Sequence, residues 1–156
     1  MTTDHATRHL FVIVVLGWMA TGCGDPAVQN YKEFEDLQPV VGEIDFKGAP
    51  IPDATVNLFP VGTRLTLATA PVASGAVDET GKFELFTHRT DGRGRGVKTG
   101  EYVMTVSWMG PMKGLTSEQI DALKERLPVK YLNPQTSGLK VTVVQGENTL
   151  PKINLQ

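Results

Sequence analysis

Hydrophobic and polar residues alternate with a period of two over most of the chain after residue 38. The pattern is clearest at residues 42–46 and 100–108, where alternate apolar side chains would share one face of a strand. Turn residues such as glycine, proline and aspartate separate five further predicted strands, at residues 54–59, 72–77, 83–87, 139–144 and 150–155. About seven short strands with frequent turns predict an all-β fold, an antiparallel β-sandwich.

One segment has the spacing of a helix. Thr116 and Gln119 are spaced as a capping box, and the residues after them place Ile120, Leu123 and Leu127 on one face. We expect one short helical insertion before the sixth strand, with this apolar face against the sandwich. In the last strand, a proline at position 151 lacks a backbone N–H, so that strand is predicted at a sheet edge.

The chain begins with a short apolar run, Leu10–Ala20, which is followed within three residues by its only cysteine. A run of this length is too short to span a bilayer as a helix, but it suits the hydrophobic region of a signal peptide. Residues 20–23, Ala-Thr-Gly-Cys, resemble a bacterial lipobox, although lipoboxes more often carry leucine in place of Ala20. The alternatives are an ordinary secretory signal with a chance cysteine and a buried N-terminal helix.

This pattern predicts three parts of the chain: a signal peptide at residues 1–22, a lipid-anchored tether at residues 23–38 and a sandwich domain at residues 39–156. Cys23 would carry the lipid and become the mature N-terminus, so the membrane is the first expected partner. Asp25 stands one place later than the aspartate of the inner-membrane retention signal of enteric bacteria. We therefore expect the cell envelope, and its outer membrane rather than its inner one.

Composition excludes several classes of function. A formal net charge of −2 argues against nucleic acid as a partner, because nucleic-acid binding calls for a strongly basic face. With Cys23 lipidated, disulfides, thiolate metal sites and cysteine nucleophiles are excluded together. His88 is the one histidine after the predicted signal peptide, so a Ser-His-Asp hydrolase would depend on it. We expect no catalytic residue, no metal and no cofactor.

Basic residues and glycines gather between residues 88 and 98. Arg89, Arg93, Arg95 and Lys98 could hold an anionic partner such as lipid headgroups, a phosphorylated glycan or peptidoglycan carboxylates. The alternative is a solvated loop whose arginines provide solubility, and residues 90–96 are predicted as the most flexible stretch of the domain.

Trp108 is a second candidate for contact with a partner. With the methionines that follow it, Trp108 could form an exposed apolar patch for a sugar ring or a protein; the alternative is a core tryptophan at the end of a buried strand. A calcium site is a further possibility, because five acidic residues could supply its oxygen ligands: Asp45, Asp53, Asp78, Glu79 and Asp91. Their spacing matches no known calcium-binding loop, and the alternative is that Asp78 and Glu79 belong to a turn.

Four motifs resemble carboxypeptidase-regulatory-like domains in their order along the chain. These are the strand–turn–strand sequence of residues 41–56, the acidic turn with Gly-Lys-Phe at residues 78–83, Gly-Glu-Tyr at residues 100–102 and Leu-Pro-Val-Lys-Tyr at residues 127–131. The last motif is similar to a bacterial lipoprotein branch of the family. The resemblance covers residue 41 to residue 156 and implies a transthyretin-like or immunoglobulin-like sandwich that serves as an accessory module without catalytic residues.

Three functions follow as expectations. The first is a membrane-anchored, non-catalytic sandwich that binds or scaffolds an envelope protein or glycan. The second is a secreted module that binds carbohydrate or peptide, and the third is a hydrolase that uses His88. The transthyretin fold also hosts a hydroxyisourate-type hydrolase, but that enzyme needs several histidines.

Overall fold

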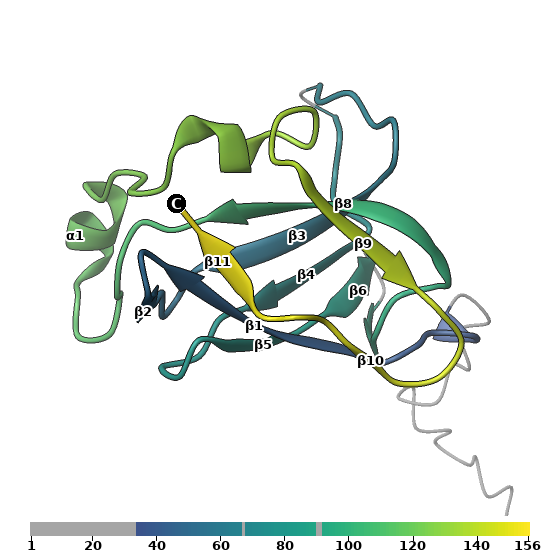
Figure 1. The fold of residues 1–156 in the computed structure, drawn as a ribbon. Helices are drawn as coiled ribbons and strands as arrows, with labels where there is room; N and C mark the ends of the chain where they lie inside the picture. The colour runs from purple at the N-terminus through teal and green to yellow at the C-terminus, as the bar shows by residue number, and fades with distance from the viewer. Residues whose placement is uncertain (1–33, 67, 90–91) are drawn as a thin grey trace, which may run out of the picture. The chain divides into compact units, whose positions relative to one another are not determined.

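The computed structural model describes residues 34–66, 68–89 and 92–156 (Figure 1). In this part of the chain, two β-sheets face each other across one apolar core, and the predicted all-β sandwich is confirmed. No helix among the described residues is both long enough and apolar enough to cross a membrane.

The larger sheet contains six antiparallel strands. Their order is β7 (Gly92–Arg95), β6 (Phe86–Arg89), β4 (Ala73–Ala76), β3 (Thr55–Pro60), β8 (Gly100–Ser107) and β9 (Leu139–Val143). Alternate residues of the central strands face the core, among them Val56, Leu58, Met104 and Val106, which are fully buried. The period-two pattern in the sequence therefore reflects the burial of one sheet face.

The smaller sheet is built around β1 (Val40–Phe46). The strands β2 (Ala49–Pro50) and β5 (Lys82–Glu84) run antiparallel to β1, whereas β10 (Asn148–Thr149) and β11 (Ile153–Leu155) run parallel to it. The parallel pairs differ from the purely antiparallel arrangement predicted above. Alternation of side chains shows which face a residue occupies, but it does not show the direction of the neighbouring strand.

Pro151 lies where the chain passes from β10 to β11. Thr149 pairs with Val41 and Ile153 pairs with Ile44, so residues 150–152 stand opposite residues 42–43 and form a bulge. Within the described part of the chain, β10 and β11 pair with β1 alone, which confirms the predicted edge position.

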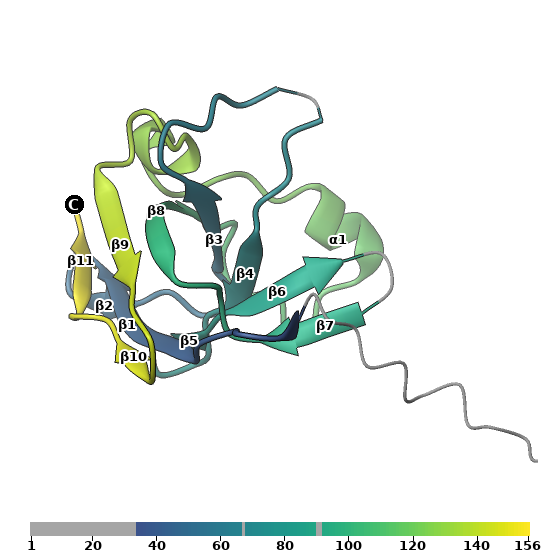
Figure 2. The same cartoon turned by 90° about the vertical axis from the view of Figure 1, so that its right-hand side faces the viewer.

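The predicted strand at residues 83–87 divides between the two sheets. β5 pairs with β1, β6 pairs with β4, and Leu85 stands between them with no exposed surface. The N–H of Leu85 donates to the carbonyl of Val40, and its own carbonyl accepts from the N–H of Gly96. One extended segment therefore joins both layers of the sandwich (Figure 2).

The helical insertion is shorter than predicted. Thr116 caps α1 (Ser117–Asp121) through the predicted capping box with Gln119, but the helix ends well before Leu127. Leu127 is buried in the core, while the other two residues of the predicted apolar face are half-buried. The chain then forms a 3-10 turn, η2 (Val129–Leu132), whose Tyr131 hydroxyl binds the backbone of Gln156.

A further correction concerns the stretch predicted to be a flexible loop at residues 90–96. Residues 92–95 form β7, which pairs with β6 in a hairpin whose tip, residues 90–91, lies outside the described residues. The alternating glycines have a structural reason, given below.

Candidate functional site

The two central arginines of the candidate partner site lie on the same face of β7. The guanidinium of Arg93 lies over the ring of Phe86, 3.5 Å from the ring centre. The guanidinium of Arg95 pairs with the carboxylate of Glu84 in the neighbouring layer. Each arginine is thus already engaged within the molecule, although both remain exposed at their outer surfaces.

The other basic candidates lie beside these arginines. Lys98 is exposed in the segment between β7 and β8, and its carbonyl accepts a hydrogen bond from the hydroxyl of Tyr102. Arg89 ends β6, and its side chain lies outside the described residues. His88 is exposed on β6 and pairs in register with Arg93.

The glycine face of β7 is covered by residues Phe34–Gln38, which we call the strap. A Cβ atom at Gly94 would lie 2.4 Å from Cδ1 of Phe34 and 2.5 Å from Cδ1 of Leu37. A Cβ atom at Gly96 would lie 2.3 Å from the carbonyl oxygen of Gln38. Glycine is therefore required at these alternate positions because the strap lies directly on the strand backbone.

Gln38 holds the end of the strap through three hydrogen bonds, two with Val97 and one with Gly146. Its N–H donates to the carbonyl of Val97 at 2.8 Å, and its carbonyl accepts from the N–H of Val97 at 2.9 Å. Its side-chain oxygen accepts from the N–H of Gly146 at 2.7 Å, in the connection between β9 and β10. The last residues of the predicted tether are therefore held against the sandwich. Cys23 lies outside the described residues.

Trp108 is half-buried and packs within the molecule. Its indole N–H donates to the carbonyl of Pro52 at 2.9 Å, and its ring meets Phe46 edge to face with centres 6.5 Å apart. The guanidinium of Arg126 lies 5.5 Å from the ring centre. This arrangement corresponds to the packed alternative of the two readings of Trp108 given above.

Glu125 ties the insertion to the end of β8, and the sequence contained no signal for it. Its carboxylate accepts from the Ser107 hydroxyl at 2.7 Å, from the N–H of Trp108 at 2.9 Å and from the N–H of Leu127 at 2.9 Å. In addition, the N–H of Arg126 donates to the carbonyl of Trp108 at 2.9 Å. These bonds take the segment after Ala122 away from a helical path, which explains why α1 is short.

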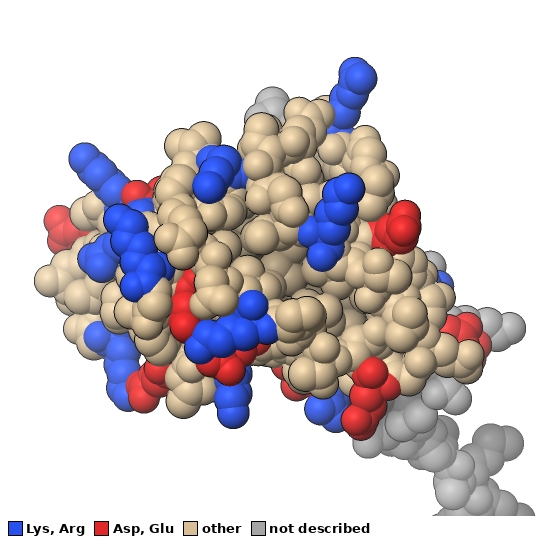
Figure 3. All heavy atoms as spheres, viewed as in Figure 1, with Lys and Arg blue, Asp and Glu red and all other residues tan. Residues whose placement is uncertain are grey.

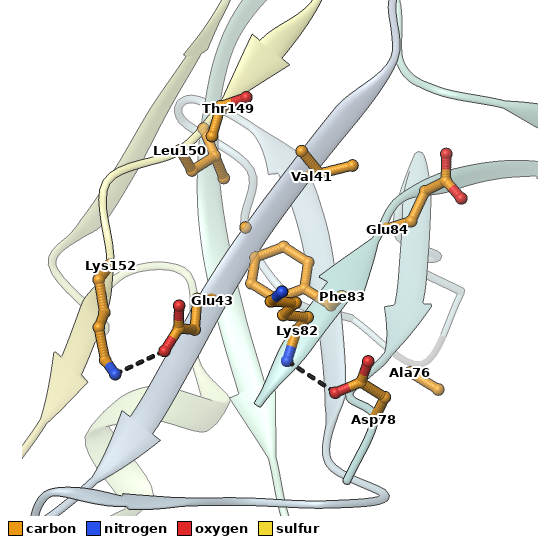
Figure 4. A pocket seen from close by; sticks show the side chains of 11 residues that line it. Val41, Glu43, Ala76, Asp78, Lys82, Phe83, Glu84, Thr149, Leu150 and Lys152 are labelled. Atoms are coloured by element: carbon orange, nitrogen blue, oxygen red, sulfur yellow. Dashed lines mark hydrogen bonds and ion pairs between the residues drawn. The ribbon is translucent and has the colours of Figure 1, made fainter. Parts of the chain in front are cut away.

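A groove of about 560 Å³ crosses the outer face of β1 between β5 and the β10–β11 bulge (Figure 4). Its apolar lining includes Val41, Phe83 and Leu150. Charged residues surround this lining: Glu43, Asp78, Lys82, Glu84 and Lys152. Sequence reasoning missed the groove because its walls come from four strands that are distant in the chain.

The glycine opposite Phe83 makes room for that ring on the core side of β1, where Phe83 is buried. Gly42 pairs with Phe83 across β1 and β5, and a Cβ atom at Gly42 would lie 2.5 Å from Cζ of the ring. The aromatic ring therefore covers the backbone of β1, where any larger residue would displace it.

Lys152 links the bulge to β1 through two carboxylates. Its Nζ lies 2.5 Å from Oε1 of Glu43 and 2.8 Å from Oδ2 of Asp45. Asp45 is only 6% exposed, and its Oδ1 has no hydrogen-bond partner among the described residues. The bonds to Asp45, and then those to Glu43, raise the pKa of Lys152.

Asp78 is held by its own turn. Its Oδ1 accepts from the hydroxyl and the N–H of Thr80, both at 2.7 Å, and from the N–H of Lys82 at 3.0 Å. The Thr80 hydroxyl, followed by the Lys82 N–H, lowers the pKa of Asp78. This carboxylate therefore stabilises the turn that precedes β5.

The acidic residues considered for calcium are dispersed over separate interactions. Asp53 accepts from the N–H of Met112, Glu79 pairs with Lys113, and Asp45 pairs with Lys152. Asp91 lies outside the described residues. Within those residues, no group of three or more histidine, cysteine, aspartate or glutamate side chains is placed to hold a metal ion.

Comparisons with known proteins give only distant structural similarities. No family model matches the chain, and no curated protein matches it significantly. Among solved structures, a DUF3823 family protein from Parabacteroides merdae is similar at 11% identity and a TM-score of 0.34, over 75% of this chain and 44% of that one. A 9R-lipoxygenase from Cyanothece is similar at 11% identity and a TM-score of 0.36, over 78% of this chain and 17% of that one. The chain thus spans less than half the length of either protein.

Proposed function

We propose that this chain is a bacterial lipoprotein whose β-sandwich holds a partner in the cell envelope without catalysing a reaction. One observation carries the proposal: an apolar run of signal-peptide length ends just before the only cysteine of the chain. The strap supports this interpretation, because it holds the last residues of the predicted tether against β7.

The finer family assignment belongs to the same proposal. The motifs that resemble a carboxypeptidase-regulatory-like domain fall on β1 to β3, the turn before β5, the start of β8 and η2, in this order along the chain. Lys47 and Gly48 have φ of 53° and 81°, as required by the tight turn between β1 and β2 in the first motif. The motifs therefore coincide with turns and with the first residues of strands in the sandwich.

A holding role is supported by how the polar side chains are used. Glu125 and Glu84 each bind a neighbouring structural element, Asp78 binds its own turn, and no described residue forms a hydrogen bond with the His88 side chain. A hydrolase would need a positioned base with a group that orients it. We therefore propose a partner-binding role for the exposed hairpin face of Arg93, Arg95 and Lys98, with Arg89 at its edge.

The groove on β1 favours the second candidate, a secreted module that binds an extended peptide or a sugar. Its apolar lining and charged surround have the character of small-ligand sites. The two candidates differ in the lipid anchor and in the surface that meets the partner.

The anchor is tested with a Cys23→Ser variant. We expect the native protein to partition into the detergent phase and the Cys23→Ser variant to remain in the aqueous phase. Mass spectrometry of the native protein should show a mature chain that begins at a lipid-modified Cys23. An unmodified Cys23 in the native protein would contradict the proposed lipid anchor, and the secreted binding module would then be the remaining candidate.

The partner-binding surface is identified by replacing Arg93 or Thr149 with a photo-crosslinking residue and irradiating intact envelopes that contain the variant. Crosslinks from Arg93 would support the hairpin, and crosslinks from Thr149 would support the groove. Turnover of an ester, peptide or glycan that His88→Ala abolishes would contradict a holding role altogether.

A further inference from the structure

Exposed aliphatic side chains gather on one side of the sandwich, away from the strap. In Figures 1 and 2, the β3–β4 connection and η2 both lie at the top, while the strap lies toward the bottom. The connection exposes 55% of Val61 and 43% of Leu65, and η2 exposes 76% of Val129. With the neighbouring Arg64 and Lys130, these residues define what we call the upper surface.

Within its own residues the upper surface carries Arg64 and Lys130 and no acidic side chain. The exposed Glu101 lies beside it, where the carbonyl of Glu101 accepts from the N–H of Val61 at 3.3 Å. The two stretches that form the upper surface, residues 60–72 and 126–138, contain no aspartate or glutamate, although the chain as a whole has a net charge of −2. Elsewhere acidic and basic side chains are interspersed, as Figure 3 shows for one face. The charge of the upper surface is therefore locally positive, with exposed aliphatic groups beside it.

The backbone of the β3–β4 connection is largely satisfied from within. Thr66 N–H donates to the Thr69 hydroxyl at 2.9 Å, Thr69 N–H donates to the Thr66 carbonyl at 3.1 Å, and the Thr69 hydroxyl donates to the carbonyl of Arg64 at 3.2 Å. The hydroxyl of Thr63 closes the base of the connection on Pro60. The first three bonds join Arg64, Thr66 and Thr69, so the connection is braced by its own side chains and backbone.

We propose that the upper surface binds the headgroup region of an anionic lipid bilayer, as a second point of attachment besides the lipid on Cys23. Leu65 and Val129 enter the interface, and Arg64 and Lys130 meet the lipid phosphates. The choice of a bilayer rests on the proposed membrane location of the protein.

The tether is long enough for both attachments to reach one membrane. Eleven residue steps separate Cys23 from Phe34, which gives a limit of about 40 Å when the chain is fully extended. A domain of this size is about 35 Å across. The sandwich can therefore turn its upper surface toward the bilayer that holds its lipid.

The test uses the mature chain from residue 23 with Cys23→Ser, so that no lipid contributes to binding. Sedimentation with vesicles of equal parts phosphatidylcholine and phosphatidylglycerol should pellet the protein, and added salt should release it. Arg64→Gln and Lys130→Gln should each weaken binding about fivefold, and Leu65→Ser should weaken it several-fold. Circular dichroism checks that each variant is folded.

Matched controls lie away from the upper surface. Lys47→Gln and Lys82→Gln remove the same charges from exposed positions at the smaller sheet, and Val144→Ser removes an exposed aliphatic group (57% exposed) near the strap. These controls should bind as the parent does. Equal losses in both sets, or no binding to anionic vesicles, would overturn the proposal, and the second result would favour an acid-rimmed protein surface as the occupant. Because the protein in this experiment carries no lipid at position 23, failure here leaves the test of Cys23 unaffected.

Discussion

At the scale of residues, a few carboxylates hold segments together through contacts that could not be predicted from the sequence. Glu125 is the clearest case, since it accepts bonds from Ser107, Trp108 and Leu127 at the junction between β8 and the insertion. We expect Glu125→Ala to lower the free energy of unfolding by about 2–3 kcal/mol, because its partly buried donors lose their acceptor. Urea denaturation measures this, with the exposed Glu118→Ala on α1 as the control. Equal stability of the two variants would mean that the carboxylate does not hold the insertion.

Lys152 gives the stability of the protein an alkaline dependence. Its pKa is raised in the folded state by Asp45 and Glu43, so the contribution of the charged ammonium is complete below the unfolded value of 10.5 and is lost as pH rises through the folded value. We expect the free energy of unfolding to fall with pH above 10.5, and to fall less steeply in Lys152→Met. Urea titrations across this range measure the two slopes. Equal slopes in the two proteins would show that the ion pairs of Lys152 with Asp45 and Glu43 do not contribute to the pH dependence of the free energy of unfolding.

At the scale of elements, the strap packs directly against β7 because the glycines of this segment have no side chain in the way. Gly94→Ala should lower stability by about 1–3 kcal/mol, because the added methyl group would overlap Phe34 and Leu37. Gly92→Ala is the matched control on the same face, since its Cβ would meet only Phe34 at 3.1 Å. Hydrogen exchange of the Gln38 and Val97 amides should accelerate more in Gly94→Ala than in Gly92→Ala. The reverse order would show that the strap does not depend on this contact.

At the scale of the whole molecule, both sheets should unfold together. The segment around Leu85 belongs to both layers, so neither sheet can open without breaking hydrogen bonds that hold the other. Trp108 is the sole tryptophan after the predicted signal peptide, so its fluorescence reports on the junction of β8 and the insertion. Its unfolding transition in urea should coincide with that of far-UV circular dichroism. An earlier fluorescence transition would indicate that the insertion detaches first.

The alternation of side chains and the turn residues were enough to predict the sandwich and most of its strands, and Pro151 indicated the edge position of the last strand. These patterns could not predict that residues 83–87 change sheets at Leu85, because that change depends on partners far away in sequence. The glycines at 92, 94 and 96 were interpreted as flexibility, yet they mark close approach of the strap, and sequence alone does not distinguish these two uses of glycine. The groove and the Glu125 contacts were missed for the same reason, since each joins residues that no local pattern connects.

The parallel pairing of β1 with β10 and β11 has a kinetic consequence. Val40 finds its partner Asn148 only across a separation of 108 residues, so the smaller sheet cannot be completed until nearly all of this domain is available. Closing so large a loop is entropically costly and slows folding relative to that of chains with local contacts. Until β1 meets its partner, the smaller sheet stays incomplete. If the protein is exported as proposed, this slow closure leaves more time for the chain to cross a membrane before the domain has folded.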